Sequence, residues 1–106
     1  MWAASAAKIG YRWNLGDGRK ILFWEDIWIG HCSLAILFWD LYSIINEQQR
    51  TVADAWDGAE LKFSFRRTVS PALFNRWLEL IELMKAVHLT GHEDTPVWFD
   101  RLGQPA

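Results

Sequence analysis

The sequence lacks several features that would assign it to a protein class at once. Its single cysteine, Cys32, excludes a disulfide framework within the chain. No apolar run approaches the roughly 20 residues that a membrane-spanning helix needs. Residues 1–8 lack the basic and long apolar regions of a secretion signal. We therefore expect a cytoplasmic or nuclear protein with no membrane partner.

The patterns that usually carry catalysis or metal binding are also missing. The chain has no Cys-x-x-Cys and no Gly-x-Ser-x-Gly. His88 and His92 have the spacing that can place two ligands on one helix face, but Gly91 between them is expected to end the helix first. The Gly-Asp-Gly at residues 16–18 lacks the glycine spacing of a phosphate loop. We predict no catalytic, cofactor-binding or metal-binding residue, and a chain that is not an enzyme.

Neither sign of charge is in large excess. The formal net charge of −2 excludes a uniformly basic nucleic-acid-binding protein. The charges are nevertheless unevenly distributed, because basic residues outnumber acidic ones in residues 1–24 and 61–77 and acidic ones dominate residues 25–60 and 78–106. Such blocks indicate either internal ion pairing or a basic face that the mild average conceals.

Apolar and aromatic side chains are abundant. With 106 residues, 51% of them apolar, the chain suffices for a single small domain over residues 1–106, of which residues 1–9 are expected to be disordered or frayed. The eight tryptophans can each bury about 150–250 Å². They either fill a small core or form an exposed patch that binds a partner. The best core candidates are Trp24, Trp28, Trp77, Trp98, Leu41 and Phe65.

Turn and helix signals in the first half of the chain predict the start of a small α+β domain. The Gly-Asp-Gly at 16–18 favours a tight turn, so residues 11–24 are predicted to form an N-terminal β-hairpin. Apolar residues at helical spacing over 34–45, behind the cap residue Ser33, predict a short helix. Residues 25–30 fit either an extension of the strand or a turn.

The second half of the chain supplies further helices. Thr51, with Asp54 three residues later, fits a capping box and opens another short helix. Residues 61–67 alternate apolar and polar side chains, which fits either a strand or an extended lead-in to the next helix. A Ser-Pro pair begins the one longer C-terminal amphipathic helix, predicted over residues 71–88. Residues 97–99 are a candidate strand.

Five basic residues are candidates for contacts with nucleic-acid phosphates. They lie close to aromatic residues in the sequence, a combination typical of proteins that pair phosphate contacts with base stacking. The alternative is that the aromatic residues form the core and the basic side chains a solvated face. On the first interpretation the partner is single-stranded RNA or an RNA–DNA hybrid, and the contacts are Arg12, Arg19, Lys20, Arg66 and Arg67.

An ordered set of landmarks carries a resemblance to a known family. The most specific is Phe-Trp-Glu-Asp-Ile-Trp-Ile-Gly at residues 23–30. Further matching residues spread over about residues 10–103 are Trp13, Gly16, Gly18, Arg19, Leu34, Asp40, Leu41, Tyr42, Thr51, Val52, Phe65, Arg66, Arg67, Trp77, Val87, His88, Leu89, Thr90, Asp94 and Trp98. In this order they resemble the segment between the reverse transcriptase domain and the reverse-transcriptase zinc-binding domain of plant LINE-type (non-LTR) retrotransposon polyproteins.

The resemblance implies a retrotransposon-derived connector and not a polymerase. In the family, the acidic pair of the polymerase lies upstream of this segment and the zinc ligands lie downstream, so neither is carried over to this chain. The implied role is non-enzymatic: positioning neighbouring domains or the template RNA, with weak nucleic-acid binding. One departure is Trp39, because the family often has proline at this position. Residues 33–42 are therefore expected to pack differently here.

Two other functions stay open at this point. The tryptophans could form an exposed patch, which would make the chain a protein–protein interaction module. Alternatively the chain is the product of a decayed element with no retained function. Salt dependence separates the first of these from nucleic-acid binding, because phosphate binding weakens steeply as salt rises and an apolar interface does not.

Overall fold

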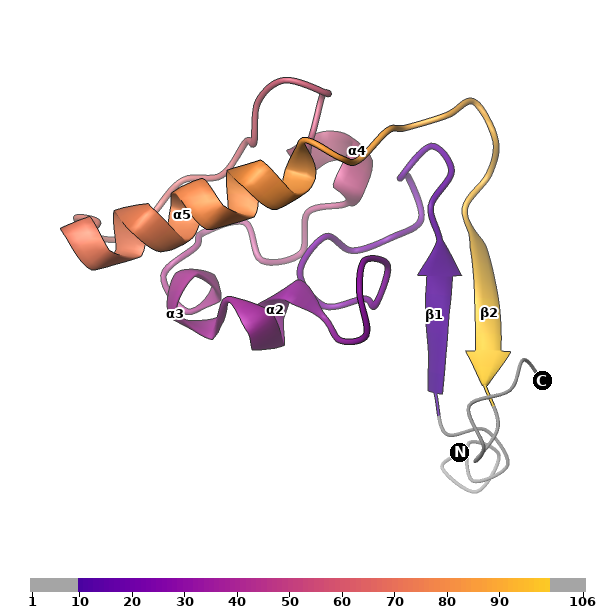
Figure 1. Ribbon diagram of the computed structural model, residues 1–106, viewed down its shortest axis with the longest axis horizontal. Helices are drawn as coiled ribbons and strands as arrows, with labels where there is room; N and C mark the ends of the chain where they lie inside the picture. The colour runs from indigo at the N-terminus through magenta and orange to yellow at the C-terminus, as the bar shows by residue number, and fades with distance from the viewer. Residues whose placement is uncertain (1–9, 100–106) are drawn as a thin grey trace.

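The computed structural model describes residues 10–99 of the chain. Within them the chain forms a two-stranded antiparallel sheet and four helices, which confirms the α+β fold class (Figure 1). The disorder or fraying predicted for residues 1–9 lies outside the described residues. The elements in chain order are β1 (Gly10–Asn14), α2 (Leu34–Leu37), α3 (Trp39–Tyr42), α4 (Val52–Ala55), α5 (Pro71–Met84) and β2 (Thr95–Phe99).

The sheet joins two segments that are far apart in the sequence. β1 forms inside the predicted hairpin of residues 11–24, but it pairs with β2, in a register that places Tyr11 opposite Trp98. The pairing predicted within residues 11–24 is therefore wrong. Residues 16–18 do turn the chain, yet the backbone N–H groups along this turn donate to Asp94 and not to a second strand.

The middle of the chain is less regular than its apolar pattern predicts. The single helix predicted over 34–45 is two short helices, because Phe38 leaves helical geometry with φ −122° and ψ 46°. The Phe38 ring is buried, with the Arg76 guanidinium carbon 4.5 Å from its centroid. Residues 25–30 are turns and irregular chain, and residues 61–67 are an extended lead-in to α5 that makes only isolated bridges. The strand alternatives for both segments are wrong.

Side-chain caps begin two of the helices. Thr51 caps α4 and Ser70 caps α5, each accepting the N–H of the third residue that follows, at 3.3 Å and 3.2 Å. α5 ends at Met84, before the end predicted at residue 88. The Val87 N–H turns back to the Met84 carbonyl at 2.9 Å, and this turn allows the Val87 side chain to be buried.

The core is built on buried aromatic rings between α5 and the segments that precede it. Phe23 and Trp24 are fully buried, with ring centroids 5.0 Å apart, and the Phe63 ring lies 5.0 Å from that of Phe23. Trp24, Trp28 and Leu41 are buried, which confirms three of the six predicted core residues.

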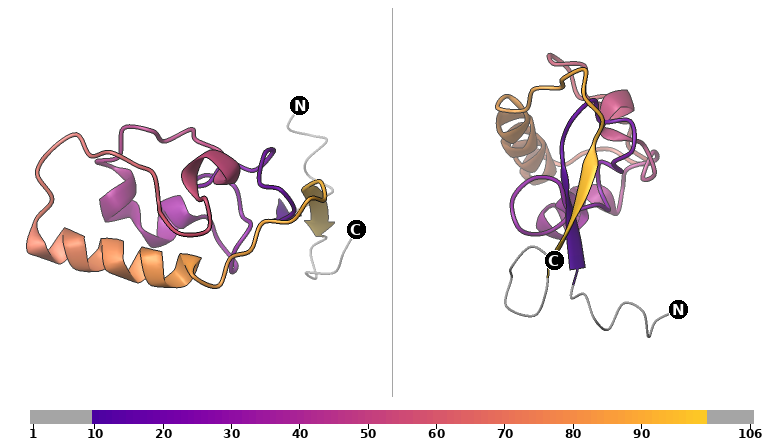
Figure 2. Two further views of the ribbon diagram at one scale, coloured as in Figure 1. Left: turned by 90° about the horizontal axis from the view of Figure 1, so that it is seen from above. Right: turned by 90° about the vertical axis from the view of Figure 1, so that its right-hand side faces the viewer.

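The other three predicted core residues are more exposed. Trp77 and Phe65 are half-buried at the edge of the core, with ring centroids 5.2 Å apart. Trp98 is 38% exposed, so its assignment to the core is wrong. It lies on β2, and the β1–β2 pair stands at one end of the molecule, away from most of the helical part (Figures 1 and 2). Its ring packs on Tyr11, 4.7 Å away.

Candidate nucleic-acid interface

The fold separates the five basic residues predicted to bind nucleic acid into two groups. Arg12 lies on β1, and Arg19 and Lys20 follow in the loop after it. Arg66 and Arg67 lie in the segment that leads into α5. In Figure 1 the β1–β2 pair and the start of α5 are at opposite ends of the molecule. The five side chains therefore do not form one continuous surface.

The group near β1 is partly neutralised. Arg12 is half-buried opposite Val97 in the sheet, and Arg19 is exposed. The Lys20 ammonium pairs with the Glu93 carboxylate at 3.5 Å, and both side chains are more than half exposed. Such an exposed pair stabilises a protein by about 0–1 kcal/mol and lowers the local positive charge. This end of the molecule presents dispersed basic side chains, one of which is already paired with a carboxylate.

The group before α5 lines a surface hollow of about 420 Å³ formed by Ser43, Ile44, Arg66 and Arg67. The Arg66 backbone N–H donates to the Ile44 carbonyl at 2.8 Å, and its guanidinium donates to the Ser43 carbonyl. The second contact fixes the direction of the Arg66 side chain. Arg67 is exposed and has no hydrogen-bond or ion-pair partner among the described residues. The hollow therefore combines one held and one free guanidinium, and no carboxylate lines it.

Glu47 and Asn46 hold the arginine segment against the end of α3. The Ser64 N–H and hydroxyl donate to the Glu47 carboxylate at 2.8 Å and 2.6 Å. The Asn46 N–H donates to the Ser64 carbonyl at 3.0 Å. Burial raises the pKa of Glu47, but the hydrogen bonds from Ser64, its own backbone N–H and the charge of Arg50 together hold that pKa below its usual value. The carboxylate is thus charged at neutral pH and already occupied by Ser64.

An exposed tryptophan lies one helical turn from the hollow. The Ser43 N–H donates to the Trp39 carbonyl at 3.0 Å, so these two residues stand four apart on one side of a helical turn. The Trp39 side chain is 63% exposed. The basic–aromatic pattern of the sequence does not identify Trp39, because it is distant from the basic residues along the chain. Its exposure could have been predicted because Trp39 is not among the apolar residues that recur at helical spacing in this segment. Those residues form its buried side and include Leu34 and Leu41.

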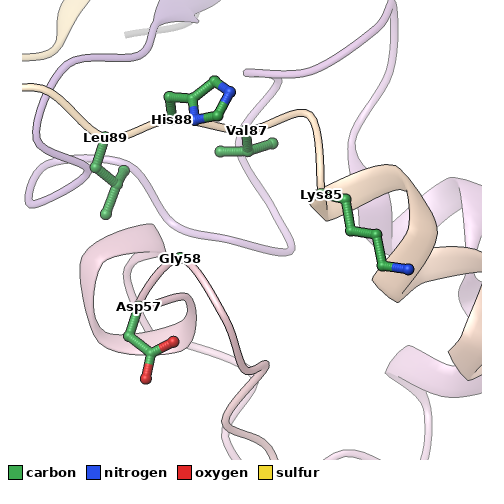
Figure 3. Close-up of a pocket in the computed structure, with 6 residues that line it drawn as sticks. All are labelled: Asp57, Gly58, Lys85, Val87, His88 and Leu89. Carbon is green, nitrogen blue, oxygen red and sulfur yellow. The ribbon is translucent and has the colours of Figure 1, made fainter.

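A second hollow of about 250 Å³ lies between the turn after α4 and the chain that leaves α5 (Figure 3). Asp57 accepts the N–H groups of its own turn at 2.9 Å and 2.8 Å, and Lys85 pairs with Glu82 at 3.0 Å. Figure 3 shows that the Asp57 carboxylate, the Lys85 ammonium and the His88 ring do not converge. In the described part of the chain, no group of three His, Cys, Asp or Glu side chains could hold a metal ion.

Comparisons of the chain with protein-family models, with curated proteins and with solved structures find no match. The resemblance to LINE-type retrotransposon polyproteins therefore stays a prediction from the sequence. Among residues 10–99, no helix combines the length and the apolar character that crossing a bilayer requires. The geometry of the Arg66–Arg67 hollow and of its surroundings is what bears on function.

Proposed function

We propose that this chain is a non-enzymatic module that binds the backbone of nucleic acid at the hollow lined by Arg66 and Arg67. The observation that carries the proposal is the pairing of a held guanidinium with a free one around a hollow that no carboxylate lines. Guanidinium groups suit phosphates because their planar donors match two phosphate oxygens at once. Within a retrotransposon-derived connector, such a site would hold the template RNA.

The arrangement of the two arginines favours phosphate over a random surface contact. Arg66 is already tied to the Ser43 carbonyl, so binding a phosphate with its remaining N–H groups immobilises little additional side chain. Arg67 keeps all of its donors for a ligand. Two such contacts are consistent with the weak binding that the family resemblance implies, because each phosphate contact adds one unit of charge neutralisation.

A paired set of double variants tests this proposal. Arg66→Ala with Arg67→Ala removes the charges at the hollow, and Arg12→Ala with Arg19→Ala removes the same charge near β1. Binding of a short fluorescein-labelled oligouridylate is followed by fluorescence anisotropy between about 50 mM and about 200 mM salt. With single strands each lost phosphate contact lowers the slope of log K against log salt by about 0.7. We expect the first variant to lose about 1.4 units of slope and the second to lose little.

The opposite result would assign the binding to the other end of the molecule. If the variant of Arg12 and Arg19 loses affinity and the variant of Arg66 and Arg67 does not, the hollow has no role in nucleic-acid binding. Circular dichroism of both variants shows that neither effect comes from unfolding. All four side chains contact solvent, so their truncation is expected to change stability little.

A protein partner is the second candidate, and exposed apolar side chains on two helices favour it. Ile36 on α2 is 70% exposed, and Phe74 and Leu78 on α5 are 52% and 46% exposed. Exposed apolar groups of this size mark interaction surfaces when they are contiguous. Binding to a protein through them would persist as salt rises and would be lost on Ile36→Ser or Phe74→Ser. Binding that falls steeply with salt would contradict this candidate.

A further inference from the structure

We propose that Trp39 is a base-stacking platform beside the Arg66–Arg67 hollow, so that the site selects unpaired nucleic acid over duplex. This inference rests on the proposed function, since the arginines supply the phosphate contacts. Trp39 and Ser43 stand four residues apart across one helical turn. Side chains in this relation lie on the same side of the turn, with Cβ atoms about 5–6 Å apart. Because Ser43 lines the hollow, Trp39 lies one helical turn from a residue of that lining.

Tyr42 supports the indole from one side. The two rings have centroids 5.6 Å apart with an interplanar angle of 38°. The Tyr42 hydroxyl donates to the Glu25 carboxylate at 2.6 Å, and Gln49 donates to the same oxygen at 2.7 Å. The hydrogen bond to Glu25 raises the pKa of Tyr42, so the phenol stays protonated at neutral pH. An indole that is 63% exposed and packs against one neighbouring ring offers a stacking surface that costs less to order than an unsupported side chain.

The charges around Trp39 permit a phosphate backbone to approach. Asp40, the adjacent residue, is paired with the Arg76 guanidinium at 3.2 Å. Arg76 is itself anchored by the Leu37 carbonyl at 2.6 Å and lies over the Phe38 ring. Arg76 also pairs with the Glu79 carboxylate at 3.1 Å, so this fixed cation is shared by two carboxylates and partly counters the charge of Asp40. The two arginines that line the hollow have no carboxylate partner among the described residues.

The combination of an indole with two guanidiniums indicates which kind of nucleic acid fits. In a duplex the base faces are stacked on one another, and only phosphates and groove edges are presented to a protein. A single strand exposes base faces and phosphates together, and an aromatic platform beside a basic groove uses both. The arginines alone do not distinguish single strands from duplexes. Trp39 is therefore the residue that would make the distinction.

Four forms of the chain test the platform: the wild type, Trp39→Ala, Trp39→Phe and the double variant of Arg66 and Arg67. Each is titrated with a short oligouridylate, with an abasic oligomer of equal length and with a duplex RNA. Ile36→Ala is the matched control, because it removes an apolar side chain that is 70% exposed from the neighbouring helix. Anisotropy of a fluorescein label gives each dissociation constant.

We expect Trp39→Ala to weaken oligouridylate binding by about 5- to 150-fold, the range that loss of one stacked base gives. Trp39→Phe should retain most of the affinity, and Ile36→Ala all of it. On the abasic oligomer and the duplex, Trp39→Ala should bind as the wild type does. The salt slope of Trp39→Ala should be unchanged, whereas the double arginine variant loses slope and affinity on all three ligands.

The outcomes separate failure of the platform from failure of the proposed function. If Trp39→Ala binds oligouridylate as the wild type does and the double arginine variant does not, the platform is refuted and phosphate binding stands. If Trp39→Ala weakens binding of the abasic oligomer as much as binding of oligouridylate, the residue does not act by stacking. If the wild type binds none of the ligands, both proposals are overturned.

Discussion

Replacing Asp94 with asparagine tests the contact that joins β1 to β2. Asp94 is 2% exposed. Its Oδ1 accepts the N–H groups of Gly16 at 2.6 Å and Gly18 at 2.9 Å, and its Oδ2 accepts that of Lys20 at 2.9 Å. The carboxylate therefore connects the loop after β1 with the residue that immediately precedes β2. Losing it should loosen the whole end of the molecule that carries the sheet.

The magnitude follows from the number and kind of hydrogen bonds. Each bond to a charged group contributes about 1.5–3 kcal/mol. Asparagine keeps one carbonyl oxygen for Gly16 and Gly18, but its amide is a donor that faces the Lys20 N–H. We expect Asp94→Asn to lower the free energy of unfolding by about 2–3 kcal/mol. Asp94→Ala leaves three N–H groups without their acceptor, two of them buried, and should lower it by about 4–6 kcal/mol. This is a large part of the about 5–15 kcal/mol that stabilises a typical domain.

Urea unfolding followed by tryptophan fluorescence measures the effect. The midpoint should fall while the m value stays unchanged, and the melting temperature of Asp94→Asn should fall by about 10–20 °C. Glu93→Gln is the matched control, because it alters an adjacent carboxylate whose exposed pair with Lys20 spans 3.5 Å. That control should change stability by at most about 1 kcal/mol. If Asp94→Asn unfolds at the same urea concentration as Glu93→Gln, the carboxylate does not hold the loop.

Two further predictions concern the half-buried side chains around the candidate interface. Trp77→Ala should destabilise the fold by about 2 kcal/mol, less than the about 3–5 kcal/mol expected for a fully buried tryptophan. A urea midpoint equal to that of the parent would show that the packing of Trp77 does not contribute to stability. The pKa of Glu47 is lowered in the folded chain from the usual 4.5. Its stabilising effect is therefore present above about pH 4.5 and is lost as pH falls through the lower folded pKa. Glu47→Gln should flatten the acid dependence of the urea midpoint, and an equally steep dependence would contradict the assignment.

Local signals in the sequence were sufficient where the structure depends on neighbours along the chain. Thr51 caps a helix by accepting an N–H three residues away, so its role can be predicted from a stretch of four residues. Ser70 with Pro71 is equally local. The two-helix break at Phe38 was not readable, because it depends on burial of the Phe38 ring under Arg76, which approaches from a distant helix.

The error in strand pairing has a non-local cause. A Gly-Asp-Gly turn after a short strand favours a hairpin when only local geometry is considered. In the structure the N–H groups of Gly16 and Gly18 donate to Asp94, which is 78 and 76 residues away in the sequence. A single buried carboxylate so far along the chain produces no periodic pattern in the sequence from which its contact with the turn could be predicted. Exposure of Trp98 follows from the same pairing, because β2 joins β1 at the end of the molecule.

The candidate site was only partly predictable for a similar reason. Arg66 and Arg67 could be found from the local interleaving of basic and aromatic residues, whereas their separation from Arg12 depends on the fold. Ser43 comes to the arginines through the Ile45–Phe65 bridge and the Arg66–Ser43 contact, and Trp39 lies one helical turn from Ser43. Neither contact has a signature in the sequence.

An amide NMR titration of the uniformly ¹⁵N-labelled chain with oligouridylate tests the central claim most directly. Nucleic-acid binding at the hollow predicts that the amide signals of Ser43, Arg66 and Arg67 shift with added ligand, together with the Trp39 indole N–H. The shifts should shrink as salt rises from about 50 mM to about 200 mM. Signals that do not move at this end of the molecule, or that move only around Arg12 on β1, would contradict the account.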